Sequence, residues 1–185
     1  FMMTDRFYNG DVSNDQVVDG DVINPRGLYQ GGDFKGVTAK LDYLKELGVD
    51  SIWLTPIVEN VPQNVGSATD GEYYAYHGYW ALNFEELNPH LGSLADFHEL
   101  IDAAAEKGIN IIVDVVLNHA GYGAEETFEG MVRTKEEDKQ GDDQLGSLSG
   151  LPDFKTEEAT VRNQLVAWQA SWLKRSTTAK GNSIY

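Results

Sequence analysis

The chain has 185 residues, of which 41% are hydrophobic and 11% aromatic, so it can bury a sizeable core and is not a disordered tail. Its formal net charge of −16 disfavours nucleic acid and membranes as partners, because their phosphates would repel it. It contains no cysteine, which excludes disulfides and thiolate metal sites, and no run that approaches the roughly 20 apolar residues of a membrane span. The net charge does not exclude neutral or cationic partners.

The chain begins with what looks like the end of a strand at residues 1–4, and a helix–strand unit follows. Gly48 ends a helix that is predicted by apolar residues at helical spacing, namely Val37, Leu41, Leu44 and Leu47. Residues 51–55 then predict a strand, which Pro56 stops. The first unit is therefore helix, glycine and strand.

The same unit recurs further along the chain. Ser93 and Asp96 predict a capping box, Gly108 marks the end of that helix, and residues 110–115 predict the next strand. A third helix is expected to begin near Thr156, and Ser183-Ile184-Tyr185 looks like the opening of a fourth strand. Alternating strands and helices of this kind imply a parallel sheet.

Two parallel architectures are compatible with this order: an open doubly wound sheet and an eight-stranded barrel. No Gly-x-Gly-x-x-Gly follows a strand, and the loops after the strands are long, which favours the barrel. A closed barrel typically needs about 250 residues. The predicted fold class is therefore α/β, the N-terminal portion of a (β/α)8 TIM barrel with about three and a half β/α units. We expect such a piece, cut within strands at both ends, to expose unpaired edges and to fold poorly alone.

The segment 120–152 has no helical or strand period and a dense negative charge. It predicts a loop excursion or small subdomain after the third strand. The chain then divides into residues 1–119, with the first three strands, residues 120–152, and residues 153–185, with the third helix and the start of strand four. Most of the acidic side chains are interpreted as a solvated surface.

The most informative segment runs from Asp114 to His119. It follows an apolar, β-branched run at residues 109–113, which is typical of a strand covered on both faces. An acid, an amide and an imidazole therefore lie at the carboxyl end of a buried strand, where an α/β barrel keeps its chemistry.

Four stretches together resemble the α-amylase family of glycoside hydrolases, and their order and spacing match that family. They are Thr4–Asp11, Gly31–Phe34, Tyr76–Trp80 and Asp114–His119, with the segment before Asp153 in agreement. The pattern is most similar to the branch of cyclodextrin glucanotransferases and maltogenic amylases. The resemblance implies the N-terminal part of a catalytic barrel that acts on α-1,4-glucans such as starch, maltooligosaccharides and cyclodextrins.

The resemblance also implies substrate-binding roles. Tyr79 would stack on the sugar at the cleavage point, His77 would bond its hydroxyls, and Trp80 would support this wall. His119 would bond the same sugar most strongly in the transition state. Asp114 would hold Arg6 or the neighbouring strand ends near the site. The plain alternatives are an aromatic core cluster at Tyr76–Trp80 and a simple buried Asp–Arg pair.

Two calcium sites are expected, with Ca²⁺ as the only cofactor. In the first, Asn9, Asp11, Asn14 and Asp15 offer hard oxygen ligands, and Asp33 with the Gly31 carbonyl could complete six or seven. The alternative is an Asn/Asp-rich turn, since these residues favour turns for local reasons. The second site, implied by the resemblance, would take Asn118 and Asp153.

No catalytic acid is assigned to this chain. Retaining glycosidases need two carboxyl groups about 5 Å apart, and the family carries its nucleophile and acid/base after strands four and five, beyond Tyr185. The isolated chain is therefore expected to be inactive. Hydrolase and transglycosylase cannot be separated, and a non-catalytic α-amylase-like subunit or glycan-binding module is the alternative.

The expected partners are an α-glucan substrate and the remaining part of the same barrel, in the same chain or another. A secreted or periplasmic location is expected, because polysaccharides do not cross membranes and millimolar extracellular calcium suits weak sites.

Overall fold

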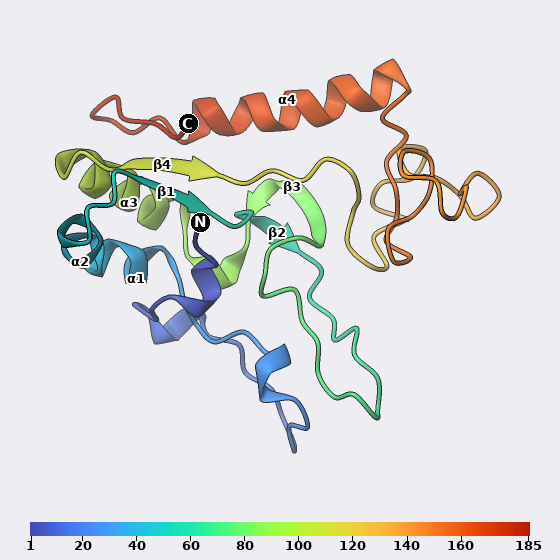
Figure 1. Ribbon diagram of the computed structural model, residues 1–185, viewed down its shortest axis with the longest axis horizontal. Coiled ribbons are helices and arrows are strands. Elements are labelled where there is room, and N and C mark those ends of the chain that lie inside the picture. The colour runs from blue at the N-terminus through green and yellow to red at the C-terminus, as the bar shows by residue number, and fades with distance from the viewer.

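The computed structural model describes residues 1–185 (Figure 1). The helices are α1 (Phe34–Ala39), α2 (Leu41–Glu46), α3 (Leu94–Glu106) and α4 (Ala159–Arg175), and the strands are β1 (Ser51–Leu54), β2 (Val58–Asn60), β3 (Ala81–Leu87) and β4 (Asn110–Val113). Short 3-10 turns occupy Thr4–Arg6, Val12–Asn14, Pro25–Gly27 and Pro89–Leu91. No helix is long and apolar enough to cross a membrane.

The central feature is a parallel pair, β1 with β4, extended on both sides by single backbone contacts. Asp114 N donates to Leu54 O, which joins the two strands at their carboxyl ends. On the outer edge of β1, Met2 N donates to Trp53 O at 2.8 Å, in a parallel bridge. On the outer edge of β4, Tyr185 N donates to Ile111 O at 2.9 Å. The four segments are thus neighbours in space in the order in which they occur in the chain.

The parallel arrangement of β1 and β4 confirms the prediction, but the outer segments are shorter than expected. Residues 1–4 contribute one bridge and Tyr185 one hydrogen bond instead of strands. The sheet is also not covered on both faces, because Trp53 in β1 is 46% exposed and packs only edge-on against Phe1 at 5.2 Å.

Helix boundaries follow local chemistry, with two differences from the sequence. The capping box of Ser93 with Asp96 is present as predicted, at the start of α3. The helix expected over residues 37–47 is instead two helices, α1 and α2, since Lys40 leaves the helical conformation between them. The last helix begins at Ala159 and not near Thr156, whose carbonyl accepts the Arg162 guanidinium instead.

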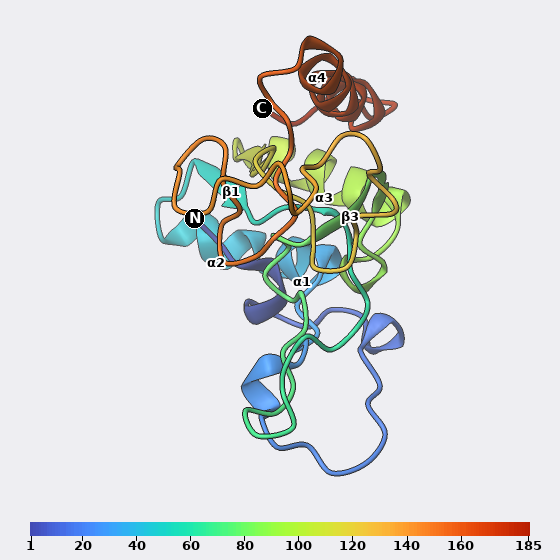
Figure 2. The same ribbon diagram turned by 90° about the vertical axis from the view of Figure 1, so that its right-hand side faces the viewer.

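An antiparallel hairpin of β2 and β3 was not predicted from the sequence. Its register is irregular between Val58 and Asn60. Strand β2 is only three residues long, and the burial of β3 does not alternate, so the hairpin lacks a clear period-2 pattern of half-buried strands. The hairpin carries the loop of residues 61–80, which projects from the body beside the loop of residues 17–27 (Figures 1 and 2). This loop brings the Tyr76–Trp80 segment to the strand exits.

Buried aromatic side chains connect the helices to one another and to the hairpin. Phe34 of α1 packs on Phe97 of α3, with ring centroids 4.8 Å apart, and both are fully buried. In Figures 1 and 2, α4 lies on the opposite side of β4 from α1 and α2. It is tied to β3 by the Trp172 indole N–H, which donates to Phe84 O at 2.6 Å.

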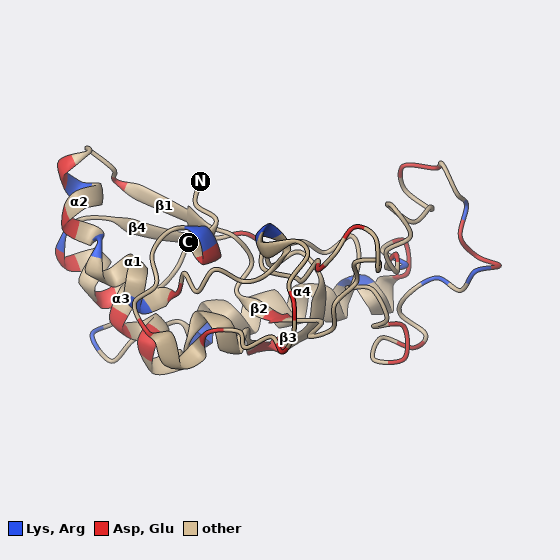
Figure 3. Cartoon of the chain, turned by 90° about the horizontal axis from the view of Figure 1, so that it is seen from below, with Lys and Arg blue, Asp and Glu red and all other residues tan.

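The segment 120–152 consists of turns, with no helix or strand, as its lack of period predicted. An isolated bridge pairs Val132 with Phe154 and joins the segment to the chain before α4. Its acidic side chains lie along the loops at the end of the molecule that Figure 3 shows furthest from α2. The division of the chain at residues 119 and 152 stays a prediction.

Candidate functional site

Polar side chains gather where the parallel segments end. Thr4 N, just after the Met2 bridge, donates to Thr55 Oγ1 after β1 at 3.3 Å. Asp114 follows β4, and its Oδ2 accepts the Tyr79 hydroxyl at 2.7 Å. Together with the Asp114 N–H bond to Leu54 O, the Thr4–Thr55 contact brings together the exits of three segments that are far apart in the sequence, as a parallel sheet in this order requires.

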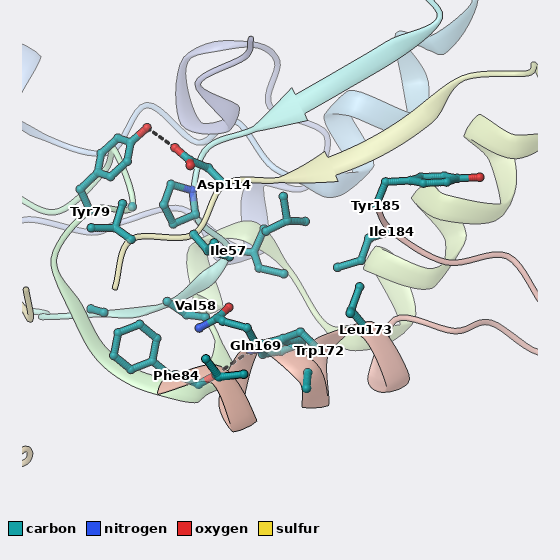
Figure 4. Close-up of a pocket in the computed structure, with 18 residues that line it drawn as sticks. Ile57, Val58, Tyr79, Phe84, Asp114, Gln169, Trp172, Leu173, Ile184 and Tyr185 are labelled. Carbon is teal, nitrogen blue, oxygen red and sulfur yellow. Dashed lines mark hydrogen bonds between the residues drawn. The ribbon is translucent and has the colours of Figure 1, made fainter. Parts of the chain in front are cut away.

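A cavity of about 350 Å³ lies beside this edge, between the β4 exit, the hairpin and α4 (Figure 4). Its walls are mainly apolar and include Ile57, Val58, Phe84 and Leu173. Tyr79 and Asp114 lie at one end of the cavity in Figure 4, at a distance from Tyr185 at the other. Gln169 of α4 is the other side chain of the lining that can hydrogen-bond a sugar hydroxyl through an amide or carboxylate group.

The Tyr76–Trp80 segment is held tightly against the end of β1. Gly78 has a φ of +87°, and a Cβ there would come within 2.5 Å of Pro56 O, so only glycine fits. Trp80 N donates to Asn60 Oδ1 at 2.6 Å, which anchors the other end of the segment to β2. The aromatic side chains between these anchors are therefore fixed in place.

His77 contacts both of its predicted partners in the wall. Its ring stacks on Tyr79, with centroids 5.7 Å apart at 23°, and meets Trp80 edge-on at 4.5 Å. Its Nδ1 accepts Tyr79 N–H at 3.0 Å. Burial, with a smaller contribution from the Arg6 charge, lowers the pKa of His77 to about 4. The ring is neutral at pH 7, and its proton lies on Nε2, where it can donate to a ligand.

His119 lies next to Tyr79, although the two are 40 positions apart. Its Nε2–H donates to Tyr79 O at 3.1 Å, since a carbonyl can only accept. Burial lowers the pKa of His119, so this ring is also neutral at pH 7. Nδ1 is then the accepting nitrogen, and Asn118 Nδ2 donates a long hydrogen bond to it at 3.4 Å.

Arg6 does not pair with Asp114, which corrects one of the two interpretations of Asp114. Arg6 Nε lies 3.0 Å from Asp5 Oδ2, its Nη2 donates to Arg26 O and Leu28 O, and its guanidinium lies 3.7 Å over the Tyr76 ring. The adjacent Asp5 is nearer and buried, so its carboxylate forms the ion pair with the Arg6 guanidinium. Arg6 thereby connects the first strand exit to the aromatic segment, while Asp114 holds the Tyr79 hydroxyl.

Asp5 was not assigned a role from the sequence. Its carboxylate accepts Gln30 N–H at 2.9 Å and Gly31 N–H at 3.3 Å. Burial raises the pKa of Asp5 to about 6, an effect that these hydrogen bonds and Arg6 reduce. Its position directly before Arg6 at a strand exit is the only indication that the sequence offers.

Asn9, Asp15 and Gly31 converge in the first candidate calcium region. A Cβ on Gly31 would come within 2.3 Å of Asn9 Nδ2 and 2.5 Å of Asp15 Oδ1, and Asn9 Nδ2 donates to both Asp15 oxygens at 2.8 and 3.0 Å. Asn9 Oδ1 and Asn14 Oδ1 are buried and have no hydrogen-bond partner. Buried oxygens without hydrogen-bond partners are suitable ligands for a hard cation such as Ca²⁺.

The other two predicted ligands in this region are engaged by the protein. Asp33 is fully buried, and its carboxylate accepts N–H groups from Gly36 at 2.6 Å, Gly10 at 3.1 Å and Asp11 at 2.8 Å. It therefore caps α1 and ties the loop to it. The Asp11 carboxylate pairs with Lys35 at 2.5 Å, and this pairing holds its pKa well below the usual range.

The second candidate calcium region is built differently. The Asp153 carboxylate is buried and accepts Arg133 Nε at 2.8 Å, while Arg133 also donates to both oxygens of Glu157. Asn118 O accepts Phe154 N–H at 2.9 Å. Arg133 was missed from the sequence, where it is one cation within an acidic segment. The chain contains no cluster of three or more His, Asp or Glu side chains able to hold a metal, so amide and carbonyl oxygens are needed in either region.

Parallel segments in sequential order, with aromatic and polar groups gathered at their carboxyl ends, are an arrangement that α/β-barrel proteins have. The family model described as "Alpha amylase, catalytic domain" matches residues 1–143. The chain belongs to the α-amylase family.

Known relatives agree with this. The chain is 44% identical over 126 residues to a periplasmic alpha-amylase of Escherichia coli, covering 66% of this chain and 19% of that protein. It is 38% identical over 130 residues to a cyclomaltodextrin glucanotransferase of Thermoanaerobacterium thermosulfurigenes, covering 67% and 18%. An alpha-amylase of Geobacillus thermoleovorans, solved in complex with acarbose, matches with a TM-score of 0.73 and 37% identity over 94% of this chain and 36% of that one. The chain thus spans about a fifth of the length of these curated relatives.

Proposed function

We propose that this chain forms the N-terminal part of the catalytic domain of a retaining glycoside hydrolase or transglycosylase that acts on α-1,4-glucans. The observation that carries the proposal is the convergence of His77, Tyr79 and His119 at one edge of the parallel sheet. Relatives named alpha-amylase and cyclomaltodextrin glucanotransferase support the substrate class. The chain would supply sugar-binding and calcium-binding groups, and the catalytic acids would come from the rest of the barrel.

The chemistry of this edge suits a neutral sugar. A glucose ring presents C–H groups to an aromatic face and hydroxyls at its rim, so a site for it combines aromatic rings with hydrogen-bonding groups. The Tyr79 ring would stack on the sugar, and the His77 Nε2–H would donate to a hydroxyl. His119 Nδ1 would exchange its long 3.4 Å hydrogen bond from Asn118 Nδ2 for one from a sugar hydroxyl. Trp80 and Asp114 would hold this wall through their contacts with His77 and Tyr79.

The sequential order of the parallel segments supports the first three and a half units of a (β/α)8 barrel, with residues 120–152 as an excursion after its third strand. The remaining units would pack on the apolar cavity beside α4, either from the same chain or from another. The proposed location is outside the cytoplasm, on the ground that one relative is named periplasmic and that the substrate is a polysaccharide.

A calcium ion would bind in the loop of residues 9–15. Asn9, Asn14, Asp15 and the Gly31 carbonyl would hold it, because two of these amide oxygens are buried without partners. Asp33 and Asp11 would support the loop through their bonds to Gly10 and Lys35. The ion would add rigidity to the segment that follows Arg6. A second ion at Asn118 and Asp153 would have to share the carboxylate with Arg133.

Steady-state kinetics of the complete protein on a soluble maltooligosaccharide tests the proposal. His119→Ala should lower kcat more than it raises KM, by roughly 30- to 150-fold, or about 2–3 kcal/mol, if its bond matters most in the transition state. Tyr79→Ala should damage both constants, since a stacking platform holds the ring before and during reaction. Exposed Tyr43→Ala on α2 is the matched control.

Two outcomes would contradict these roles. A rise in KM alone for His119→Ala would make it a uniform binder, and unaltered kinetics in both variants would place this edge outside the active cleft. Glucan binding by the complete protein without any turnover would favour the second candidate, a non-catalytic α-amylase-like subunit or glycan-binding module.

A further inference from the structure

We propose that His90 is a positioning residue for the calcium ion, and that its hydrogen bond to Asn14 O holds the loop of residues 9–15 in the conformation that binds the ion. The inference rests on the calcium site of the proposed function and adds a residue outside its set of ligands. His90 lies in the short turn Pro89–Leu91 between β3 and α3, 76 positions from Asn14. Only the tertiary structure brings the two together.

The His90 ring meets the loop at the peptide bond between two proposed ligands. His90 Nδ1 lies 2.9 Å from Asn14 O. Since a carbonyl oxygen can only accept, Nδ1 carries the proton and donates the hydrogen bond. This carbonyl belongs to the peptide that joins Asn14 to Asp15. The hydrogen bond therefore fixes the direction in which both ligand side chains leave the backbone.

The other polar groups of Asn14 are also engaged, with one exception. Asn14 N donates to Asp11 O at 3.3 Å, and Asn14 Nδ2 donates to Asp33 Oδ2 at 3.2 Å. Its side-chain oxygen Oδ1 is buried and has no hydrogen-bond partner. With His90 on the carbonyl, the residue is held at three points, and Oδ1 is the atom left to bind a cation.

The same ring supports the second segment that carries a proposed ligand. The Tyr29 ring packs on His90, with ring centroids 4.2 Å apart at 35°. Gly31, whose carbonyl is a proposed ligand, follows two residues after Tyr29. Tyr29 N also donates to Gln16 Oε1 at 3.0 Å, directly after the loop. One histidine therefore contacts both segments that would hold the ion.

The turn that presents His90 is anchored in the body of the protein. His90 N donates to Asn88 Oδ1 at 3.0 Å. Asn88 is buried, and its own N–H donates to Ile57 O at 2.9 Å, between β1 and β2. Asn88 Nδ2 also donates to the Tyr29 hydroxyl at 3.4 Å. The donor is thus in place before the ion binds, and a preorganised site loses less conformational entropy on binding than a mobile one.

Calorimetric titration of Ca²⁺ into the complete, chelator-treated protein tests this role. The binding step that Asn9→Ala abolishes is the one that belongs to the loop. For that step we expect His90→Phe, which keeps a ring against Tyr29 but lacks the donor, to raise Kd roughly 3- to 10-fold, the range for one hydrogen bond. The matched control is His98→Phe on α3, because His98 Nε2 donates to another backbone carbonyl, Arg175 O, at 2.7 Å. It should leave Kd unchanged.

A second pair of variants separates the hydrogen bond from the ring, and it decides the matter if His90→Phe does not fold. Asparagine places Nδ2 where histidine has Nδ1, and leucine has nearly the same shape without a donor. We therefore expect His90→Asn to bind calcium more tightly than His90→Leu. Thermal unfolding gives an independent readout, since a raised Kd reduces the stabilisation that calcium provides. A purely structural role would lower stability equally with calcium and with chelator.

An unchanged Kd in His90→Phe, or equal affinities of His90→Asn and His90→Leu, would overturn the role of His90 and leave the calcium site intact. If the wild-type protein shows no binding step that Asn9→Ala abolishes, the proposed calcium site is wrong and the inference fails with it. The roles proposed for His77, Tyr79 and His119 would be unaffected by either result.

Discussion

The loop of residues 9–15 and the junction of Asn118 with Asp153 both gather asparagine and aspartate side chains, but their oxygen atoms are satisfied in different ways. In the first, the buried amide oxygens of Asn9 and Asn14 have no partner. In the second, the Asp153 carboxylate is neutralised by Arg133, whose side chain is also buried. The same residue types therefore leave room for a cation in one region and replace it with a guanidinium in the other.

The difference teaches that ligand-like residues in a sequence do not by themselves make a metal site. When the cation of a buried ion pair is removed, the remaining charge is uncompensated and the folded state is strongly destabilised. A buried amide oxygen without a partner destabilises the folded state less, and a bound cation can satisfy it. We therefore expect the stability of the Asp153 region to depend on Arg133 and not on calcium. The stability of the loop of residues 9–15 should depend on calcium.

The largest effect is expected for Arg133→Met in the complete protein. Asp153 would stay buried without its partner, so we expect a loss of about 3 kcal/mol in unfolding free energy near neutral pH. Burial already raises the pKa of Asp153, and without Arg133 it rises further above the unfolded value. The loss is therefore absent below the unfolded pKa and grows as pH rises through the folded pKa.

Urea unfolding at acid and neutral pH measures this, with exposed Lys180→Met as the control for a lost cation. An equal loss at both pH values would argue against an unpaired carboxylate. Recovery of the variant in calcium would show that the freed Asp153 can bind the ion, and would bring the two regions closer together.

Asp33→Ala should have the next largest effect. It removes the acceptor of the Gly36, Gly10 and Asp11 N–H groups, so we expect a loss of about 2 kcal/mol. Because these are protein contacts, the loss should persist when calcium is chelated. Thermal unfolding with and without chelator measures it, and a loss seen only in the presence of calcium would make Asp33 a ligand.

Chelation of calcium should act on the first region alone. An ion at ten times its Kd stabilises the folded state by about 1.4 kcal/mol, which chelation would remove. Asn9→Ala should abolish this sensitivity, and Asn118→Ala should retain it. Differential scanning calorimetry of the two variants decides, and the reverse pattern would assign the ion to Asp153 instead.

The smallest effect is expected for Asp11→Ala. Its partner Lys35 is 44% exposed in the side chain, and solvent screens such a pair, so unfolding free energy should change within experimental error. The chelator sensitivity should also be unchanged. A clear drop in that sensitivity would return Asp11 to the set of ligands.

Several parts of the fold could be predicted because they depend on short-range rules. The capping box at Ser93 is a local exchange of hydrogen bonds across three positions, and the parallel pairing of β1 with β4 follows from the alternation of helices and strands. The family was recognised from motifs in order, and the family model confirms it. The β2–β3 hairpin was missed because β2 has only three residues and β3 does not alternate between buried and exposed side chains, which is the period on which a strand prediction depends.

The candidate site could be predicted only as a set of residues. The sequence named His77, Tyr79, Asp114 and His119, and the structure brings all four together. It did not reveal that Asp114 bonds Tyr79, 35 positions away, or that Arg6 pairs with Asp5 instead. Side-chain partners of this kind depend on which groups meet after packing.

By itself the amino-acid sequence determined the parallel strands β1 and β4, the helices between them, and the chemical types at the strand exits, since turn residues, apolar spacing and motif order act over a few positions. Only the tertiary structure decided which oxygens are free, which charges are neutralised and which rings share a wall. Asn9 and Asp153 look alike in the sequence, and they differ because Arg133, from a segment with no regular structure, reaches one and not the other.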